Sequence, residues 1–134
     1  MKMQVIIEKD ERGYSVYSDG LKSGIIIGDG KSVAEAKEDF MNTLEEVRST
    51  YPARGMEIPE ELVDPEFEFK YDVASVFDEL DFINLTKFAE LSGFNSSLLR
   101  HYKRGDFAIS GKQAFKIEKA LHDIGKRLVA ISVF

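Results

Sequence analysis

The sequence contains no cysteine and only two histidines, His101 and His122. Without thiols, neither a disulfide framework nor a thiolate metal site can form. Two separated histidines cannot make a histidine cluster, so the sequence predicts no metal site, no cofactor and no catalytic histidine. We interpret His101 as an exposed residue or as a contact to a base or phosphate, and His122, which stands beside Asp123, as a surface residue.

Long apolar runs are also absent. No stretch is long enough to span a bilayer, and the N-terminal run is too short for the core of a signal peptide. The apolar content of 43% is nevertheless enough for a packed core, and the charges are too balanced in sign for a disordered chain. The sequence therefore predicts a soluble cytoplasmic protein with no membrane partner.

Basic residues are scarce in the first half of the chain. The formal net charge is −6, but residues 1–72 hold 9 Lys and Arg against 17 Asp and Glu, a net charge of −8. Residues 73–134 hold 9 against 7, and from Asn84 onward the count is 9 against 4, a net charge of +5. This asymmetry predicts two domains, 1–72 and 73–134, with separate functions.

The first half predicts four strands and one long helix. Apolar and polar residues alternate in "MQVIIEK", "YSVYS" and "FEFKYDV", and "SGIIIGDG" is a short β-branched run. Ser32 and Glu35 form a capping box, in which the Glu35 side chain reaches back to the amide of Ser32. We expect Pro52 to end this helix and residues 53–66 to form a surface loop. The predicted fold is α+β, with the helix lying on a small antiparallel sheet.

The second half predicts an all-α domain. Asn84 and Asn95 can each cap a helix, and Gly93 lies in the short turn between them. Ser110 and Gln113 form a capping box for a further helix, for which Gly125 is the expected C-cap. The final "RLVAISVF" is too apolar for a free tail, so we expect a short C-terminal strand or a segment used in dimerisation.

The helix from Ser96 to Arg104 has the pattern of a DNA-recognition helix. Leu99 and Tyr102 lie on the same side of this helix and can anchor the helix to the core of the domain. Phe107 is interpreted as a side chain that fills the same core. A helix-turn-helix needs such an anchored second helix with donors and acceptors on its exposed side. The candidate base and phosphate contacts in the second half are Asn84, Lys87, Asn95, Ser96, Ser97, Arg100, His101, Lys103, Arg104 and Lys112.

The stretch "LTKFAELSGFNSSLLRHYKRGDFAISGKQAFKIEKAL" resembles the helix-turn-helix of the phage-repressor class, which includes Cro and lambda repressor. The ending "KALHDIGKRLVAISV" is similar to the C-terminus of HicB-type antitoxins that carry this module. "VIIEKDERGYSV" and "GDGKSVAEAKEDFMNTLEEV" resemble the HicB N-terminal domain, a partial ribonuclease-H-like fold. "GLKSGIII" departs from that pattern, because it replaces a segment that commonly contains proline and cysteine. The residues that match the repressor pattern are Ala89, Gly93, Ser96, Ser97, Arg104 and Gly105.

This resemblance implies an antitoxin with two tasks. Residues 73–134, as a homodimer or homotetramer, would bind double-stranded operator DNA and repress transcription of the operon. Residues 1–72 would bind and neutralise a small basic HicA-like toxin that cleaves mRNA. The net charge of −8 is consistent with such a partner, since opposite potentials speed encounter. The same negative charge is equally consistent with preventing the protein from binding nucleic acid nonspecifically.

Two other functions are open to this sequence. Complete ribonuclease-H folds are catalytic, but two-metal hydrolysis needs several converging carboxylates. Three of the five available carboxylates crowd the first hairpin turn and are interpreted as part of a solvated turn, so we predict no enzyme. The five are Glu8, Asp10, Glu11, Asp19 and Asp29. The second alternative is a stand-alone transcriptional repressor whose N-terminal domain dimerises or senses a ligand.

Overall fold

The computed structural model describes residues 2–106 and 109–134, which form a four-stranded sheet and six helices. Phe107 lies outside the described residues. The chain divides into two compact units, Met1–Ser75 and Val76–Phe134, called unit 1 and unit 2 below. The division falls three residues after the boundary that the charge pattern predicts. Each unit has its own buried core.

The sheet of unit 1 is mixed, so the prediction of an antiparallel sheet was wrong. The strand order is β3-β2-β1-β4, and β1 pairs antiparallel with β2 but parallel with β4, which places Lys2 beside Glu66. The long helix between β3 and β4 is part of a crossover that lets β4 run in the same direction as β1. The strands are β1 Lys2–Asp10, β2 Gly13–Asp19, β3 Ile27–Gly30 and β4 Glu66–Tyr71.

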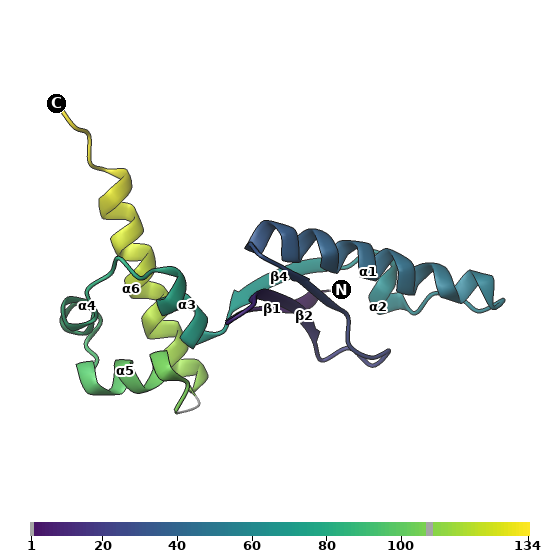
Figure 1. Cartoon of the computed structure of the whole chain (residues 1–134), viewed down its shortest axis with the longest axis horizontal. Helices are drawn as coiled ribbons and strands as arrows, with labels where there is room; N and C mark the ends of the chain where they lie inside the picture. Colours follow the sequence, from purple (N-terminus) through teal and green to yellow (C-terminus); the bar gives the residue numbers. More distant parts are fainter. Residues whose placement is uncertain (1, 107–108) are drawn as a thin grey trace. The chain divides into compact units, whose positions relative to one another are not determined.

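Helix α1, Val33–Ala53, covers one face of this sheet (Figure 1). Its apolar stripe packs on the inward-facing residues of the strands, and Phe40 is fully buried at the centre. Strand β3 approaches α1 through Gly28 and Gly30, where a Cβ atom would collide with the helix backbone. The buried core consists of Met3, Val5, Ile7, Val16, Ile26, Ala36, Phe40, Leu44 and Leu62.

The ends of α1 differ from the prediction in detail. The Ser32 hydroxyl accepts a hydrogen bond from the Glu35 amide at 3.1 Å, but the Glu35 carboxylate accepts from the Lys31 amide, not from Ser32. Pro52 lies within the last turn, and α1 ends one residue later, at Ala53. The predicted loop contains a short helix, α2, Glu60–Val63, which forms because Leu62 is buried in the core.

Unit 2 is helical. Two pairs of aromatic rings pack edge to face in its core. The ring centroids of Phe77 and Phe88 are 5.6 Å apart, and those of Phe94 and Tyr102 are 6.4 Å apart. The buried residues include Leu99 and Ile117. Helix α3 begins in unit 1 and continues into unit 2. The helices are α3 Val73–Glu79, α4 Leu85–Ser92, α5 Ser96–Arg104 and α6 Gly111–Val129.

The expected C-terminal strand does not form. Helix α6 continues through Gly125, the expected C-cap, because one glycine costs a helix only about 1 kcal/mol. Residues 130–134 adopt no regular structure, and a strand needs a neighbouring strand to pair with. The Ser110 hydroxyl caps α6 by accepting from the Gln113 amide. Within residues 2–106 and 109–134, no helix is both long and apolar enough to cross a membrane.

Candidate nucleic-acid interface

Side-chain caps start helices α4 and α5, and a tight turn that contains Gly93 and Asn95 joins the two helices. The Asn84 side chain accepts from the Lys87 amide at 3.0 Å, and that of Asn95 accepts from the Ser97 amide at 2.8 Å. Gly93 has a φ of 77°, a left-handed conformation that glycine adopts at little cost. These local interactions end one helix and start the next within three residues, which fixes the direction in which α5 leaves the turn.

The two sides of α5 differ sharply in burial. Leu99 is fully buried and Tyr102 nearly so, as their spacing predicts. Ser97, Arg100 and Arg104 are exposed. Ser96, His101 and Lys103 are half-buried, so they present less surface than expected from the sequence. The helix is therefore anchored from behind and presents two arginines and a hydroxyl group to solvent.

Arg100 lies beside the first turn of α4. Its Nη2 atom donates to the hydroxyl of Thr86 at 3.3 Å, which brings the middle of α5 close to the helix that Asn84 caps. Thr86 is a neutral partner, and no acidic side chain pairs with Arg100 within the described residues. The positive charge of this exposed guanidinium group is therefore not offset by an ion pair with any described residue.

Arg104 is held at the C-terminal end of α5 by an acidic neighbour. Its Nε atom donates to the Asp106 carboxylate at 2.9 Å, and this contact, with a second from His101, lowers the pKa of Asp106. His101 Nδ1 lies 3.1 Å from the same carboxylate and 3.0 Å from Arg104 Nη2. One nitrogen cannot donate to Asp106 and accept from Arg104 at once, so in any one tautomer of the His101 ring only one of the two contacts is a hydrogen bond.

The remaining candidates lie at helix starts. Lys87 is exposed in the first turn of α4, 3.8 Å from the Glu90 carboxylate, an exposed ion pair that a phosphate could displace. Lys112 is exposed in the first turn of α6. Helix starts present unpaired amide groups and a partial positive charge, so basic residues there are suited to contact phosphates.

Two residues of this site, Thr86 and Asp106, were not among the contacts predicted from the sequence. Thr86 lies fourteen residues before its partner Arg100, and only the packing of α4 on α5 brings the two together. Asp106 could have been found from its position just beyond Gly105, because an acid two residues after an arginine is within its reach. Both residues hold an arginine in place on the exposed side of α5.

No protein-family model, curated protein or solved structure matches this chain. Its function therefore has to be inferred from its residues and their geometry, and the likeness to HicB-type antitoxins stays a prediction.

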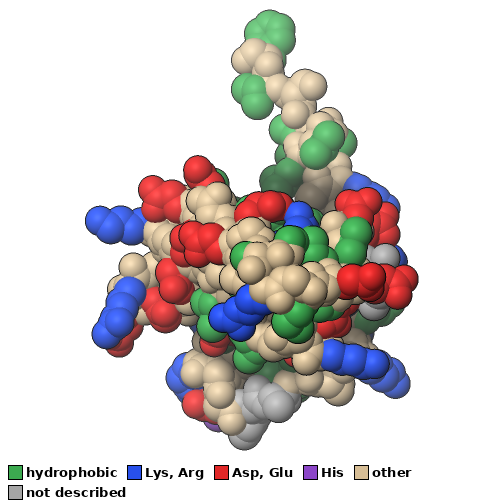
Figure 2. Space-filling model, turned by 90° about the vertical axis from the view of Figure 1, so that its right-hand side faces the viewer, with side chains coloured by type: hydrophobic (Ala, Val, Ile, Leu, Met, Phe, Trp, Pro, Cys, Tyr) green, Lys and Arg blue, Asp and Glu red, His purple; other side chains and the backbone are tan. Residues whose placement is uncertain are grey.

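Unit 1 presents acidic side chains, interspersed with basic ones, on the face that Figure 2 turns toward the viewer. Two of the carboxylates considered for catalysis have structural contacts. Asp10 accepts from the amides of Arg12 and Gly13 in the hairpin turn, and Asp29 accepts from the Ser15 hydroxyl at 2.6 Å. Among the residues that the structure describes, no three His, Cys, Asp or Glu side chains are placed to hold a metal ion.

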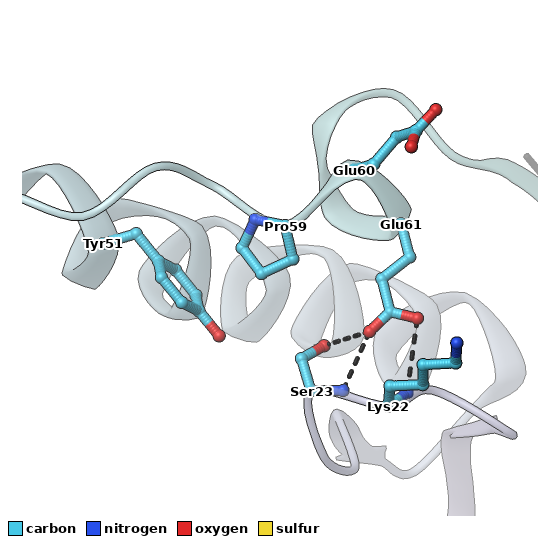
Figure 3. A pocket seen from close by; sticks show the side chains of 6 residues that line it. All are labelled: Lys22, Ser23, Tyr51, Pro59, Glu60 and Glu61. Carbon is cyan, nitrogen blue, oxygen red and sulfur yellow. Dashed lines mark hydrogen bonds between the residues drawn. The ribbon is translucent and has the colours of Figure 1, made fainter.

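An open pocket of about 480 Å³ lies at the end of α1 in unit 1 (Figure 3). The carboxylate of Glu61 closes one side, where it accepts from the Ser23 hydroxyl at 2.6 Å and from the amides of Ser23 and Lys22. These hydrogen bonds, above all that from the Ser23 hydroxyl, lower the pKa of Glu61. Because all three donors belong to the loop between β2 and β3, the carboxylate braces that loop against α2. The other lining residues are Tyr51, Pro59 and Glu60.

Proposed function

We propose that unit 2 binds duplex DNA in a sequence-specific manner, as a homodimer, with α5 lying in the major groove. The observation that carries this proposal is the pairing of a buried side, formed by Leu99 and Tyr102, with an exposed side that holds Ser97, Arg100 and Arg104. A recognition helix requires this combination, because its position must be fixed before its exposed side chains can distinguish bases.

The roles of the side chains follow from their chemistry. Arg100 has no acidic partner among the described residues, so it can donate two parallel hydrogen bonds to a guanine without breaking an ion pair. Ser97 can donate to or accept from any base. Lys87, Lys112 and the amides at the start of α4 would contact phosphates, which position the protein but do not read the sequence. Arg104 would first have to leave Asp106.

Arg100→Ala is expected to weaken binding to the cognate operator by about 1–3 kcal/mol, roughly 5- to 150-fold. The reason is the loss of a bidentate base contact. The measurement is a fluorescence-anisotropy titration of the full chain with a duplex taken from upstream of its own gene and with a scrambled duplex. Affinity for both duplexes should fall steeply as salt rises, because phosphate contacts release counterions.

The control for this experiment is Arg54→Ala, which removes the same side chain from an exposed position in unit 1. It should leave both affinities unchanged. An equal loss on the two duplexes in Arg100→Ala would show that Arg100 contacts only phosphate. Absence of any salt-dependent binding by the wild-type chain would contradict the proposed function altogether.

We further propose that unit 1 neutralises a small basic HicA-like toxin in the cytoplasm, so that the chain is an antitoxin that represses its own operon. Its net charge of −8 supports this role, since none of the 17 acidic residues that create it is fully buried. The competing role, a stand-alone repressor, would need no such partner. A neighbouring reading frame that encodes a small, strongly basic protein would favour the antitoxin.

Co-expression of the two reading frames is expected to give a complex that survives Arg100→Ala, because the proposed toxin-binding surface lies in unit 1. The measurement is affinity purification through a tag on the basic protein, followed by size-exclusion chromatography with and without operator DNA. Loss of the complex in Arg100→Ala would contradict the division of tasks between the units. Failure of the wild-type chain to co-purify would favour the stand-alone repressor.

A further inference from the structure

The face of the sheet that points away from α1 carries a row of apolar side chains. Val5 and Ile7 are buried in the core, so Ile6, which lies between them in β1, points to the opposite face. Tyr17 of β2 pairs with Ile6, and Ile27 of β3 pairs with Tyr17. Because directly paired residues lie on the same face of a sheet, these three side chains form one row across three strands.

This row is open to solvent. Ile27 is 50% exposed, and Ile6 and Tyr17 are half-buried. Ile25 extends the row beyond the start of β3, because it is 70% exposed whereas its neighbour Ile26 is buried in the core. The solvent-facing side of a sheet usually carries polar residues, so an apolar row is unexpected here. The name sheet patch is used below for Ile6, Tyr17, Ile25 and Ile27.

Carboxylates border the sheet patch. Glu8, Asp19 and Asp29 each lie two residues beyond a member of the patch on the same strand, so they share its face, and all three are exposed. Lys70 of β4 lies on this face too, but its Nζ atom is 3.3 Å from the Glu68 carboxylate. The face therefore has an apolar centre and a negatively charged border, and apolar surface rimmed by polar residues is typical of interaction sites.

The negative charge of the border reaches the centre of the sheet patch. The pKa of Tyr17 is raised, first by burial and then by the carboxylates of Glu8, Asp72 and Asp19. A second copy of this chain would bring the same carboxylates to a face-to-face contact, and the phosphates of nucleic acid or of anionic lipid would also be repelled. A protein surface rich in Lys and Arg would instead be attracted.

We propose that the basic partner of unit 1 docks on the sheet patch, through a contact surface that has an apolar centre and a border of Lys and Arg side chains. The inference rests on the proposed toxin-binding role of unit 1 and adds the face that the partner covers. Protein interfaces commonly combine an apolar core with a polar rim, and complementary charges speed association. Tyr17 lies in the middle of the row, and tyrosine is a residue type that often dominates binding energy.

The first test removes apolar surface without removing negative charge. The full chain is titrated against the purified basic protein that the neighbouring reading frame encodes, and the dissociation constant is measured by biolayer interferometry. Ile27→Glu should weaken the complex by about tenfold or more, because a carboxylate cannot replace an apolar contact even though it adds negative charge. Far-UV circular dichroism checks that the variant is folded, and Ile25→Glu, which lies before β3, replaces it if it is not.

Met41→Glu is the matched control for Ile27→Glu. Met41 is also partly exposed, at 36%, but it lies on α1, which packs on the other face of the sheet. This substitution exchanges an apolar side chain for the same carboxylate and should leave the dissociation constant unchanged. Equal weakening by Met41→Glu and Ile27→Glu would overturn the assignment to the sheet patch.

The second test reverses the charge of the border. Glu8→Lys should slow association by about threefold or more at low salt, and the difference from wild type should shrink as salt rises. Glu46→Lys makes the same reversal at an exposed position on α1 and should slow association less. Equal slowing by the two substitutions would show a general attraction to unit 1 and would contradict docking on this face.

The outcomes separate this inference from the proposed function. A complex that Ile27→Glu and Ile25→Glu leave intact overturns the inference, while the toxin-binding proposal stands. A wild-type chain that forms no complex contradicts both, and DNA binding by unit 2 is independent of either result. If Ile27→Glu dissociates an oligomer of the chain alone, or shifts the amide NMR signals of unit 2, the sheet patch is covered by a second copy or by unit 2, which overturns the inference.

Discussion

Gly28→Ala is expected to lower the free energy of unfolding of unit 1 by about 3 kcal/mol or more, enough to unfold a marginally stable domain. A Cβ atom at this position would collide with the backbone of α1 at Phe40 and Ala36, which no side-chain rotation can relieve. Strand β3 would have to move away from α1, and the fully buried Phe40 ring would lose contacts. The measurement is urea unfolding followed by circular dichroism, together with the NMR signals of the strand amides.

Gly111→Ala is the control for Gly28→Ala. It adds the same methyl group at the start of α6, where nothing lies within 4 Å and the backbone needs no positive φ. The free energy of unfolding should change little, or rise slightly because alanine favours a helix. If Gly28→Ala were as harmless as Gly111→Ala, β3 and α1 would not approach one another as closely as the structure shows.

Leu99→Ala is expected to destabilise unit 2 by about 2–5 kcal/mol, because it leaves a cavity behind α5 at a fully buried position. If α5 reads DNA, the same substitution should abolish operator binding even though Leu99 cannot touch a base. The measurements are urea unfolding and anisotropy titration of the same protein samples.

Leu91→Ala is the matched control, since Leu91 lies on the neighbouring helix α4 with 49% of its surface exposed. It removes the same atoms from a side chain that is already half exposed to solvent. The free energy of unfolding should therefore fall by less than about 1 kcal/mol, and DNA binding should be unchanged. Equal destabilisation by the two substitutions would contradict the burial that anchors α5.

The sequence by itself determined where helices α1, α4, α5 and α6 begin. The side chains of Ser32, Asn84, Asn95 and Ser110 each accept a hydrogen bond from an amide two or three residues further on. Such a cap depends only on neighbouring residues, so it can be predicted without the fold. The alternation in β1 and the burial of Leu99 and Tyr102 were predictable for the same reason, because periodicity shows which residues share a side.

Only the tertiary structure decided the direction of β4, the length of α6 and the partner of Arg100. Alternation is the same for parallel and antiparallel strands, so the pairing of β4 with β1 depended on the path of the intervening helix. Gly125 resembles a C-cap in the sequence, yet the helix continues through it. Arg100 meets Thr86 only because α4 packs on α5. Local hydrogen bonds and periodicity are properties of adjacent residues, whereas strand pairing and side-chain contacts depend on distant segments that the folded chain brings together.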